Sequence, residues 1–85
     1  MVDIETRATT GIWPNPAIGQ INIKGYKSDG GMHIRIIDAS GITRLQHFVT
    51  ETITSIDISQ LSKGIYFVQV QPVKGEQRTL RLLKN

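Results

Sequence analysis

MHIRIID, residues 32–38, is the stretch that decides the fold, because apolar and polar residues alternate strictly along it as far as Ile36. Ile34 and Ile36 fall on one face of an extended chain, and His33 and Arg35 fall on the other. Successive side chains of a β-strand point to opposite faces, so this pattern predicts a strand with one face in a core and one in solvent. No helical period is sustained anywhere in the chain.

The same two-residue alternation recurs on both sides of this stretch, between turn signals. The further predicted strands lie within residues 19–25, 42–49, 50–59, 64–70 and 78–85. Short strands that follow one another about every ten residues are typical of sandwiches of antiparallel sheets. The sequence therefore predicts an all-β protein, an immunoglobulin-like antiparallel β-sandwich of six to seven strands.

Two local patterns predict how the strands begin and end. DASG, residues 38–41, fits a type I turn in which Asp38 hydrogen-bonds its own backbone and Gly41 takes the last position. The step of three residues from Ile53 to Ile56 breaks the strict two-residue period. A bulge or a bend is expected there.

IWPNPAIG, residues 12–19, offers unusually few backbone donors. Pro14 and Pro16 fix φ and remove two N–H groups, and each favours extended geometry in the residue before it. Such a segment can lie along the edge of a sheet but not in its centre. We expect Trp13 to tuck into the end of the core and Asn15 to satisfy nearby backbone groups.

Composition and length indicate a single small domain. The chain has 85 residues, of which 39% are hydrophobic and 20% charged, which is ordinary for a globular domain with a modest core. It has no cysteine, so neither a disulfide framework nor a thiolate metal site is expected. Residues 1–10 are polar, without the pattern of a signal peptide, and are predicted to be a linker or tail before a domain at residues 11–85. We expect this domain to be a piece of a longer protein.

The formal net charge of +3 is concentrated near the end of the sequence. Lys74, Arg78, Arg81 and Lys84 face only Glu76 there. A basic final strand has two interpretations: a solvated edge that resists aggregation, or a surface that docks or steers a partner. Nucleic acid is not an expected partner, because the basic residues alternate with leucines rather than with aromatic residues. No apolar run is long enough for a membrane helix, so membrane insertion is not expected either.

The polar residues form no pattern that predicts catalysis. His33 and His47 have no metal-ligand spacing with carboxylates, and Ser40 lies in a turn with no histidine nearby in sequence. Asp38 and Asp57 are better explained by hydrogen bonds at turns and strand ends than as an acid pair. We therefore expect no enzyme, no metal and no cofactor.

Three apolar residues fall on the outward face of their predicted strands: Ile37, Phe67 and Leu83. Scattered exposed apolar residues are normal in proteins, and a loop can also cover them. Alternatively, they form a docking strip beside Arg81 and Lys84. A receptor or a second copy of the domain could then pair with the edge strand by β-augmentation.

Four blocks follow one another along the chain: IWPNPAIGQINIKG, IRIIDASGITR, IDISQLSKGIYFVQV and TLRLLKN. In this order they resemble the C-terminal sorting domain of cargo proteins of the Bacteroidetes type IX secretion system. The family pattern has an aromatic-Pro-Asn-Pro opening, an Asp-x-x-Gly turn, an Ile-Asp-Leu/Ile-Ser-x-Leu stretch, a Gly-x-Tyr strand and a basic end. Trp13 departs mildly from it, since Tyr or Phe is commoner there. The resemblance covers residues 12–85.

The resemblance implies a non-catalytic secretion signal that is read in the periplasm by the outer-membrane translocon. A sortase-like cysteine peptidase would then remove it, and the cargo would be attached to the cell surface or released outside. Residues implied in translocon recognition are Gly64, Tyr66, Leu80, Arg81, Leu82, Leu83 and Lys84. The outward position of Phe67 adds it to these candidates. Residues of the structural family motif are Trp13, Pro14, Asn15, Pro16, Asp38, Gly41, Asp57 and Leu61. The implied cleavage region is Thr6, Arg7, Ala8, Thr9 and Thr10.

An alternative function is an immunoglobulin-like or fibronectin-like accessory module that binds carbohydrate or adhesion partners. Such a module needs exposed aromatic side chains on a platform. The chain has five aromatic residues, and Trp13 and Tyr66 among them are expected to be structural.

Overall fold

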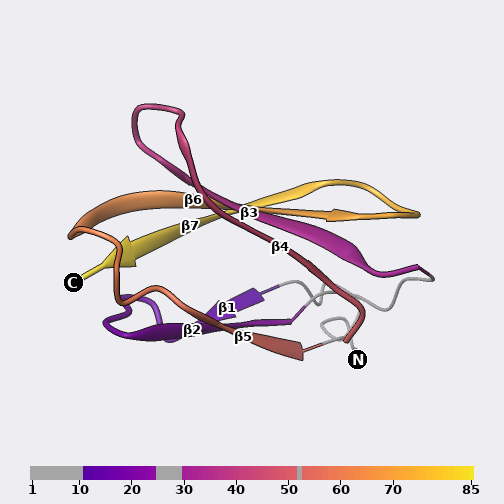
Figure 1. Ribbon diagram of the computed structural model, residues 1–85, viewed down its shortest axis with the longest axis horizontal. Coiled ribbons are helices and arrows are strands. Elements are labelled where there is room, and N and C mark those ends of the chain that lie inside the picture. The colour runs from indigo at the N-terminus through magenta and orange to yellow at the C-terminus, as the bar shows by residue number, and fades with distance from the viewer. Residues whose placement is uncertain (1–10, 25–29, 52) are drawn as a thin grey trace, which may run out of the picture.

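The computed structural model describes residues 11–24, 30–51 and 53–85, and these residues form two layers of antiparallel β-sheet (Figure 1). The strands are β1 (Gly11–Trp13), β2 (Gln20–Lys24), β3 (Met32–Asp38), β4 (Thr43–Val49), β5 (Ile53–Asp57), β6 (Gly64–Pro72) and β7 (Arg78–Lys84). One sheet has the order β1-β2-β5 and the other has the order β4-β3-β6-β7. The predicted all-β sandwich of six to seven strands is confirmed.

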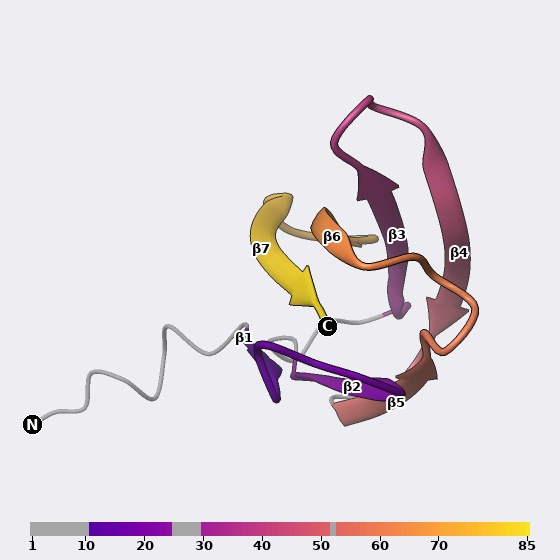
Figure 2. The ribbon, with the colours of Figure 1, turned by 90° about the vertical axis from the view of Figure 1, so that its left-hand side faces the viewer.

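The strand order is that of an immunoglobulin-like sandwich. β3 and β4 are neighbours in the four-stranded sheet, as are β6 and β7, and each pair runs antiparallel. The chain changes layer between β2 and β3, between β4 and β5, and between β5 and β6. Figure 2 shows the two layers from the side, with β7 ending beside the layer that contains β1 and β2. Connections of this Greek-key kind are typical of immunoglobulin-like folds.

The core lies between the layers and follows directly from the alternation in the sequence. Ile34 and Ile36 of β3 are fully buried, whereas His33 and Arg35 are exposed. Full burial of one such aliphatic side chain contributes about 1.5–3 kcal/mol, so the core provides most of the stabilising free energy. Its members in the described ranges are Ala17, Ile21, Ile23, Met32, Ile34, Ile36, Ile56, Ile58, Leu61, Tyr66, Val68, Val70 and Leu82.

The irregularity in the sheets lies in β4 rather than in β5. β3 pairs Ile36 with Leu45 but Ile37 with Thr43, so Arg44 is the extra residue of a bulge. β5 pairs with β2 in an unbroken register, so the predicted bulge between Ile53 and Ile56 is wrong. Because β5 stays regular, the three-residue step leaves Ile53 on the outer face, where it is 54% exposed.

The segment after β1 belongs to both layers. β1 pairs with β2, and four residues later Ala17 forms a parallel bridge with Lys84 at the end of β7. The Ala17 N–H donates to the Leu83 carbonyl at 2.9 Å, and the Asn85 N–H donates to the Ala17 carbonyl at 2.8 Å. The prediction that this proline-containing segment lies along a sheet edge is confirmed, and the edge is that of β7.

Trp13 does not tuck into the end of the core as predicted. Its side chain is 42% exposed. In β1 the neighbouring Ile12 packs against the core, and alternation along the strand then turns Trp13 to the other side.

Nowhere in the described ranges is there an apolar helix long enough to cross a membrane.

Replacing Ile34 by alanine should lower the free energy of unfolding by about 3 kcal/mol, because it leaves a cavity between the layers. The same change at Ile53 should cost less than about 1 kcal/mol, because that side chain is largely in solvent. Chemical denaturation of both variants tests this difference. Equal losses would show that the faces of β5 are wrongly assigned.

Candidate functional site

The pairing of β3, β6 and β7 gathers apolar side chains on the outer face of the four-stranded sheet. Ile37 lies opposite Phe67, Phe67 lies opposite Arg81, and Ile65 lies opposite Leu83 in the next row. Directly opposite residues on one face have Cβ atoms about 4.5–5.5 Å apart, so these side chains are neighbours. Ile65, Phe67 and Leu83 are between 38% and 44% exposed. We call Ile37, Ile65, Phe67, Arg81 and Leu83 the outer patch.

The outer patch contains an uncompensated positive charge. Arg81 is exposed, and its guanidinium has no ion-pair partner among the described residues. It stands beside Phe67, so a cation borders an apolar surface. This arrangement favours a partner that presents apolar side chains with a carboxylate next to them.

The structure divides the predicted recognition residues into two groups. Phe67, Arg81 and Leu83 are exposed and lie together in the outer patch. Leu82 is fully buried and Leu80 packs against the core. The other members are placed as follows: Tyr66 is buried, Gly64 is half-buried at the start of β6, and Lys84 is buried.

Lys84 does not lie beside the outward apolar residues as predicted. Its side chain is only 7% exposed, and its Nζ donates to the Asn85 carbonyl at 3.1 Å. Alternation along β7 places it on the same side as Leu80 and Leu82. Sequence reasoning missed Ile65, although its spacing of two residues from Phe67 places it on the outward face.

The outer edge of β7 is occupied by one side chain and one backbone segment. The Leu83 N–H donates to Asn15 Oδ1 at 3.0 Å, and Asn15 Nδ2 donates to the Arg81 carbonyl at 2.8 Å. With the two backbone bonds of Ala17, this makes a strap of residues 15–17 across the end of the strand. The predicted role of Asn15 in satisfying backbone groups is confirmed. Pro14 and Pro16 flank that side chain and carry no N–H that a further strand could use.

The strap changes the expectation of β-augmentation. A partner strand cannot pair with β7 from Arg81 to Asn85 while residues 15–17 occupy those groups. The opposite edge of this sheet is β4. A partner that reads the end of β7 therefore meets its outer face rather than its edge.

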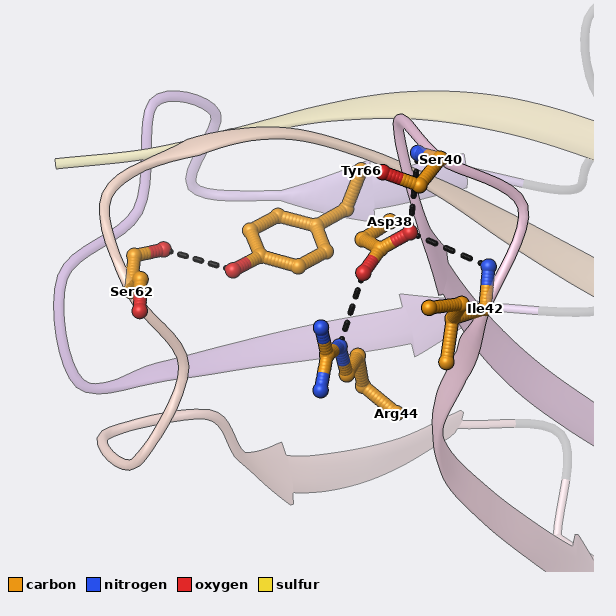
Figure 3. Close-up of polar contacts among 6 residues, drawn as sticks. All are labelled: Asp38, Ser40, Ile42, Arg44, Ser62 and Tyr66. Carbon is orange, nitrogen blue, oxygen red and sulfur yellow. Dashed lines mark hydrogen bonds and ion pairs between the residues drawn. The ribbon is translucent and has the colours of Figure 1, made fainter.

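The predicted turn at residues 38–41 is held by Asp38. Asp38 Oδ1 accepts from the Ser40 N–H at 2.9 Å and from the Ile42 N–H at 3.0 Å, while Arg44 Nε donates to Oδ2 at 2.8 Å (Figure 3). The Gly41 N–H donates to the Asp38 carbonyl at 2.9 Å, which closes the predicted turn. Gly41 has φ +92°, a conformation that favours glycine.

Local hydrogen bonds stabilise the charged form of both aspartates. The Ile42 N–H is the main cause that holds the pKa of Asp38 below its ordinary value, and Arg44 acts in the same direction. The Ser59 side chain and N–H lower the pKa of Asp57. Each carboxylate is thus engaged within its own turn.

Next to the turn at residues 38–41, the Tyr66 hydroxyl donates to the Ser62 carbonyl at 2.7 Å (Figure 3). Tyr66 therefore holds the connection between β5 and β6 in place from within the core. Leu61 in the same connection is buried, and its N–H donates to the Ile58 carbonyl at 3.0 Å. Tyr66 and Leu61 thus both stabilise this connection. In the ranges that the structure covers, no group of three or more His, Asp and Glu side chains could hold a metal ion.

Fold and site together define a small immunoglobulin-like sandwich whose last strand is strapped at its edge and exposed on its outer face. A family model described as the secretion system C-terminal sorting domain matches residues 11–85, and the chain belongs to this family. The resemblance to type IX sorting domains is therefore confirmed. The implied cleavage region, Thr6 to Thr10, lies outside the described residues.

The solved structure of PorZ has a similar fold. PorZ is described as an essential bacterial surface component of the type-IX secretion system of human oral-microbiomic Porphyromonas gingivalis. The TM-score is 0.70 at 20% sequence identity, and the match covers 89% of this chain and 11% of the PorZ chain. At this identity the likeness concerns the fold alone. No curated protein matches the chain.

Replacing Asn15 by alanine should speed amide hydrogen exchange at Leu83 and Asn85, because the strap loses its side-chain bonds. The free energy of unfolding should fall by about 1–2 kcal/mol. Asn22→Ala is the matched control, since the hydrogen bonds of Asn22 to Trp13 and Ser55 lie within the three-stranded sheet and do not involve β7. Unchanged exchange at Leu83 in Asn15→Ala would show that the strap does not hold β7.

The lowered pKa of Asp38 predicts a loss of stability in acid. The unfolded carboxyl titrates near its ordinary value of 3.8, so below that pH the unfolded chain binds a proton that the folded chain resists. The free energy of unfolding should therefore fall as the pH drops below about 4, and this fall should be smaller in Asp38→Asn. Urea denaturation between about pH 7 and pH 2.5 measures both slopes, and parallel curves would contradict the prediction.

Proposed function

We propose that this domain is the folded signal that directs an attached cargo protein through the outer-membrane translocon of the type IX secretion system. The observation that supports it best is the outer patch, where exposed residues of β6 and β7 meet. Family membership independently supports a sorting role. The domain itself acts by being recognised and carries out no catalysis.

Recognition in this proposal depends on the folded state. Phe67 and Arg81 lie on different strands and become neighbours only when β6 and β7 pair. An apolar surface of this kind supplies affinity, and the cation of Arg81, which pairs with no carboxylate among the described residues, attracts and orients an acidic partner. The buried Leu80 and Leu82 act indirectly, because they fix β7 against the core.

The domain is separated from its cargo after secretion. It passes the periplasm with its cargo and is afterwards removed by a sortase-like cysteine peptidase that cuts a linker in residues 1–10. The cargo then remains attached to the cell surface or is released outside. Cleavage between Thr6 and Thr10 would leave the strap at Asn15 intact, so the domain would keep its fold after removal.

A fluorescent reporter that carries an export signal and residues 1–85 should reach the surface of a type IX-competent cell. The double variant Phe67→Ser/Leu83→Ser should reduce surface display about tenfold or more, because truncating a hot-spot residue of an interface costs about 2 kcal/mol or more. The reporter should accumulate in the periplasm instead. Cell fractionation and surface protease accessibility measure the distribution.

The control is Ile18→Ser/Ile53→Ser, which removes two exposed apolar side chains that do not belong to the outer patch. It should be displayed normally. Deleting Leu80 to Asn85 should also abolish display, but it removes Leu82 from the core, so the point variants separate recognition from folding. Normal display of the Phe67/Leu83 variant would contradict the role of the outer patch, and display without the last residues would contradict the proposal itself.

A further inference from the structure

A polar depression lies on the same outer face, on the side of the outer patch toward the turn between β6 and β7. Its volume is about 290 Å³, near the lower limit of ligand sites in proteins. Its lining includes Arg35, His33 and the four glutamines Gln46, Gln69, Gln71 and Gln77. No aspartate or glutamate lines it within the described residues.

Internal hydrogen bonds hold several of these side chains in fixed positions. Arg35 Nη2 donates to Gln69 Oε1 at 2.8 Å, which leaves Gln69 Nε2 and the rest of the guanidinium without a partner in the described ranges. Gln71 Nε2 donates to the carbonyls of Pro72 at 3.0 Å and Gly75 at 3.3 Å, which leaves its Oε1 as an acceptor. Side chains that are ordered before binding lose less entropy when a ligand arrives.

An aromatic surface borders the depression. Phe48 lies opposite His33 across β3 and β4, with ring centroids 4.7 Å apart and planes at 58°. Phe48 is exposed, so a ligand ring can pack against it. The site therefore combines an apolar face, several amide donors and acceptors, and a cation.

We propose that this depression binds an acidic saccharide, a sugar that carries a carboxylate. Amide groups both donate and accept, which suits sugar hydroxyls. Arg35 suits the carboxylate, because a guanidinium bonds two oxygens at once. The apolar face of the sugar ring packs on Phe48. This activity is separate from the sorting role and does not depend on it.

The test titrates the isotope-labelled 85-residue chain with methyl glucuronide, methyl glucoside and acetate in separate NMR experiments. The glucuronide should saturate with a dissociation constant of about 1 mM and shift the amides of His33, Arg35, Gln69 and Gln71. The glucoside and acetate should bind at least about tenfold more weakly, because the glucoside lacks the carboxylate and acetate lacks the sugar ring.

Two variants localise the site. Arg35→Gln should weaken glucuronide binding about tenfold, as expected for a lost charge-assisted hydrogen bond. Gln69→Glu can keep its bond to Arg35 but places a carboxylate in the depression, so it should abolish glucuronide binding by repulsion. Lys24→Gln, which removes the same charge from the other sheet, should bind normally. The same spectra report whether each variant is folded.

Three results would overturn the proposal. The first is equal binding of acetate, which would identify an adventitious ion only. The second is equal binding of the glucoside, and the third is equal weakening by Arg35→Gln and Lys24→Gln. The comparison of the three ligands on the unmodified chain decides the question even where a variant fails to fold.

Discussion

The hydrogen bonds of Asn15 and Ala17 to β7 are the constraint on which the exposed end of the structure depends. An edge strand presents a row of unpaired backbone groups, and such a row invites aggregation. Here the Asn15 amide bonds Arg81 and Leu83 in the way that a neighbouring strand would. Because prolines stand on both sides of Asn15, the segment satisfies β7 without offering a new edge of its own. The strand can then expose its outer face while its edge is closed.

The same two strands serve the core and the outer surface. In β6, Tyr66 and Val68 face the core, whereas Ile65 and Phe67 face solvent. In β7, Leu82 faces the core and Leu83 faces solvent. Alternation along a strand keeps these roles apart, so an outward residue can change without altering the packing between the layers. The position of the outward residues is nevertheless fixed by the inward ones, since a shift of register by one residue would exchange the two faces.

Much of this could be predicted from local patterns, because alternation and turn chemistry are properties of neighbouring residues. The strand faces of β3, β6 and β7 and the turn at Asp38 followed from them. What could not be predicted depends on pairing partners. The bulge lies at Arg44 because β3 and β4 shift register there, and no local pattern marked it. Trp13 was expected in the core, but Ile12 occupies the inward position. The burial of Lys84 is a property of local pattern, because two-residue alternation along β7 places it on the same face as Leu80 and Leu82.

The strap has a consequence for biosynthesis. Its contacts join positions 66 and 68 residues apart, so almost the entire domain must be synthesised before they can close. Contacts between such distant residues form late, because closing a long loop costs entropy before any bond is gained. A product of premature termination would lack the backbone groups of Arg81 and Leu83, so Asn15 could not form these two hydrogen bonds. The strap can therefore form only after the last strand of the domain has been synthesised, so a closed strap marks a full-length domain.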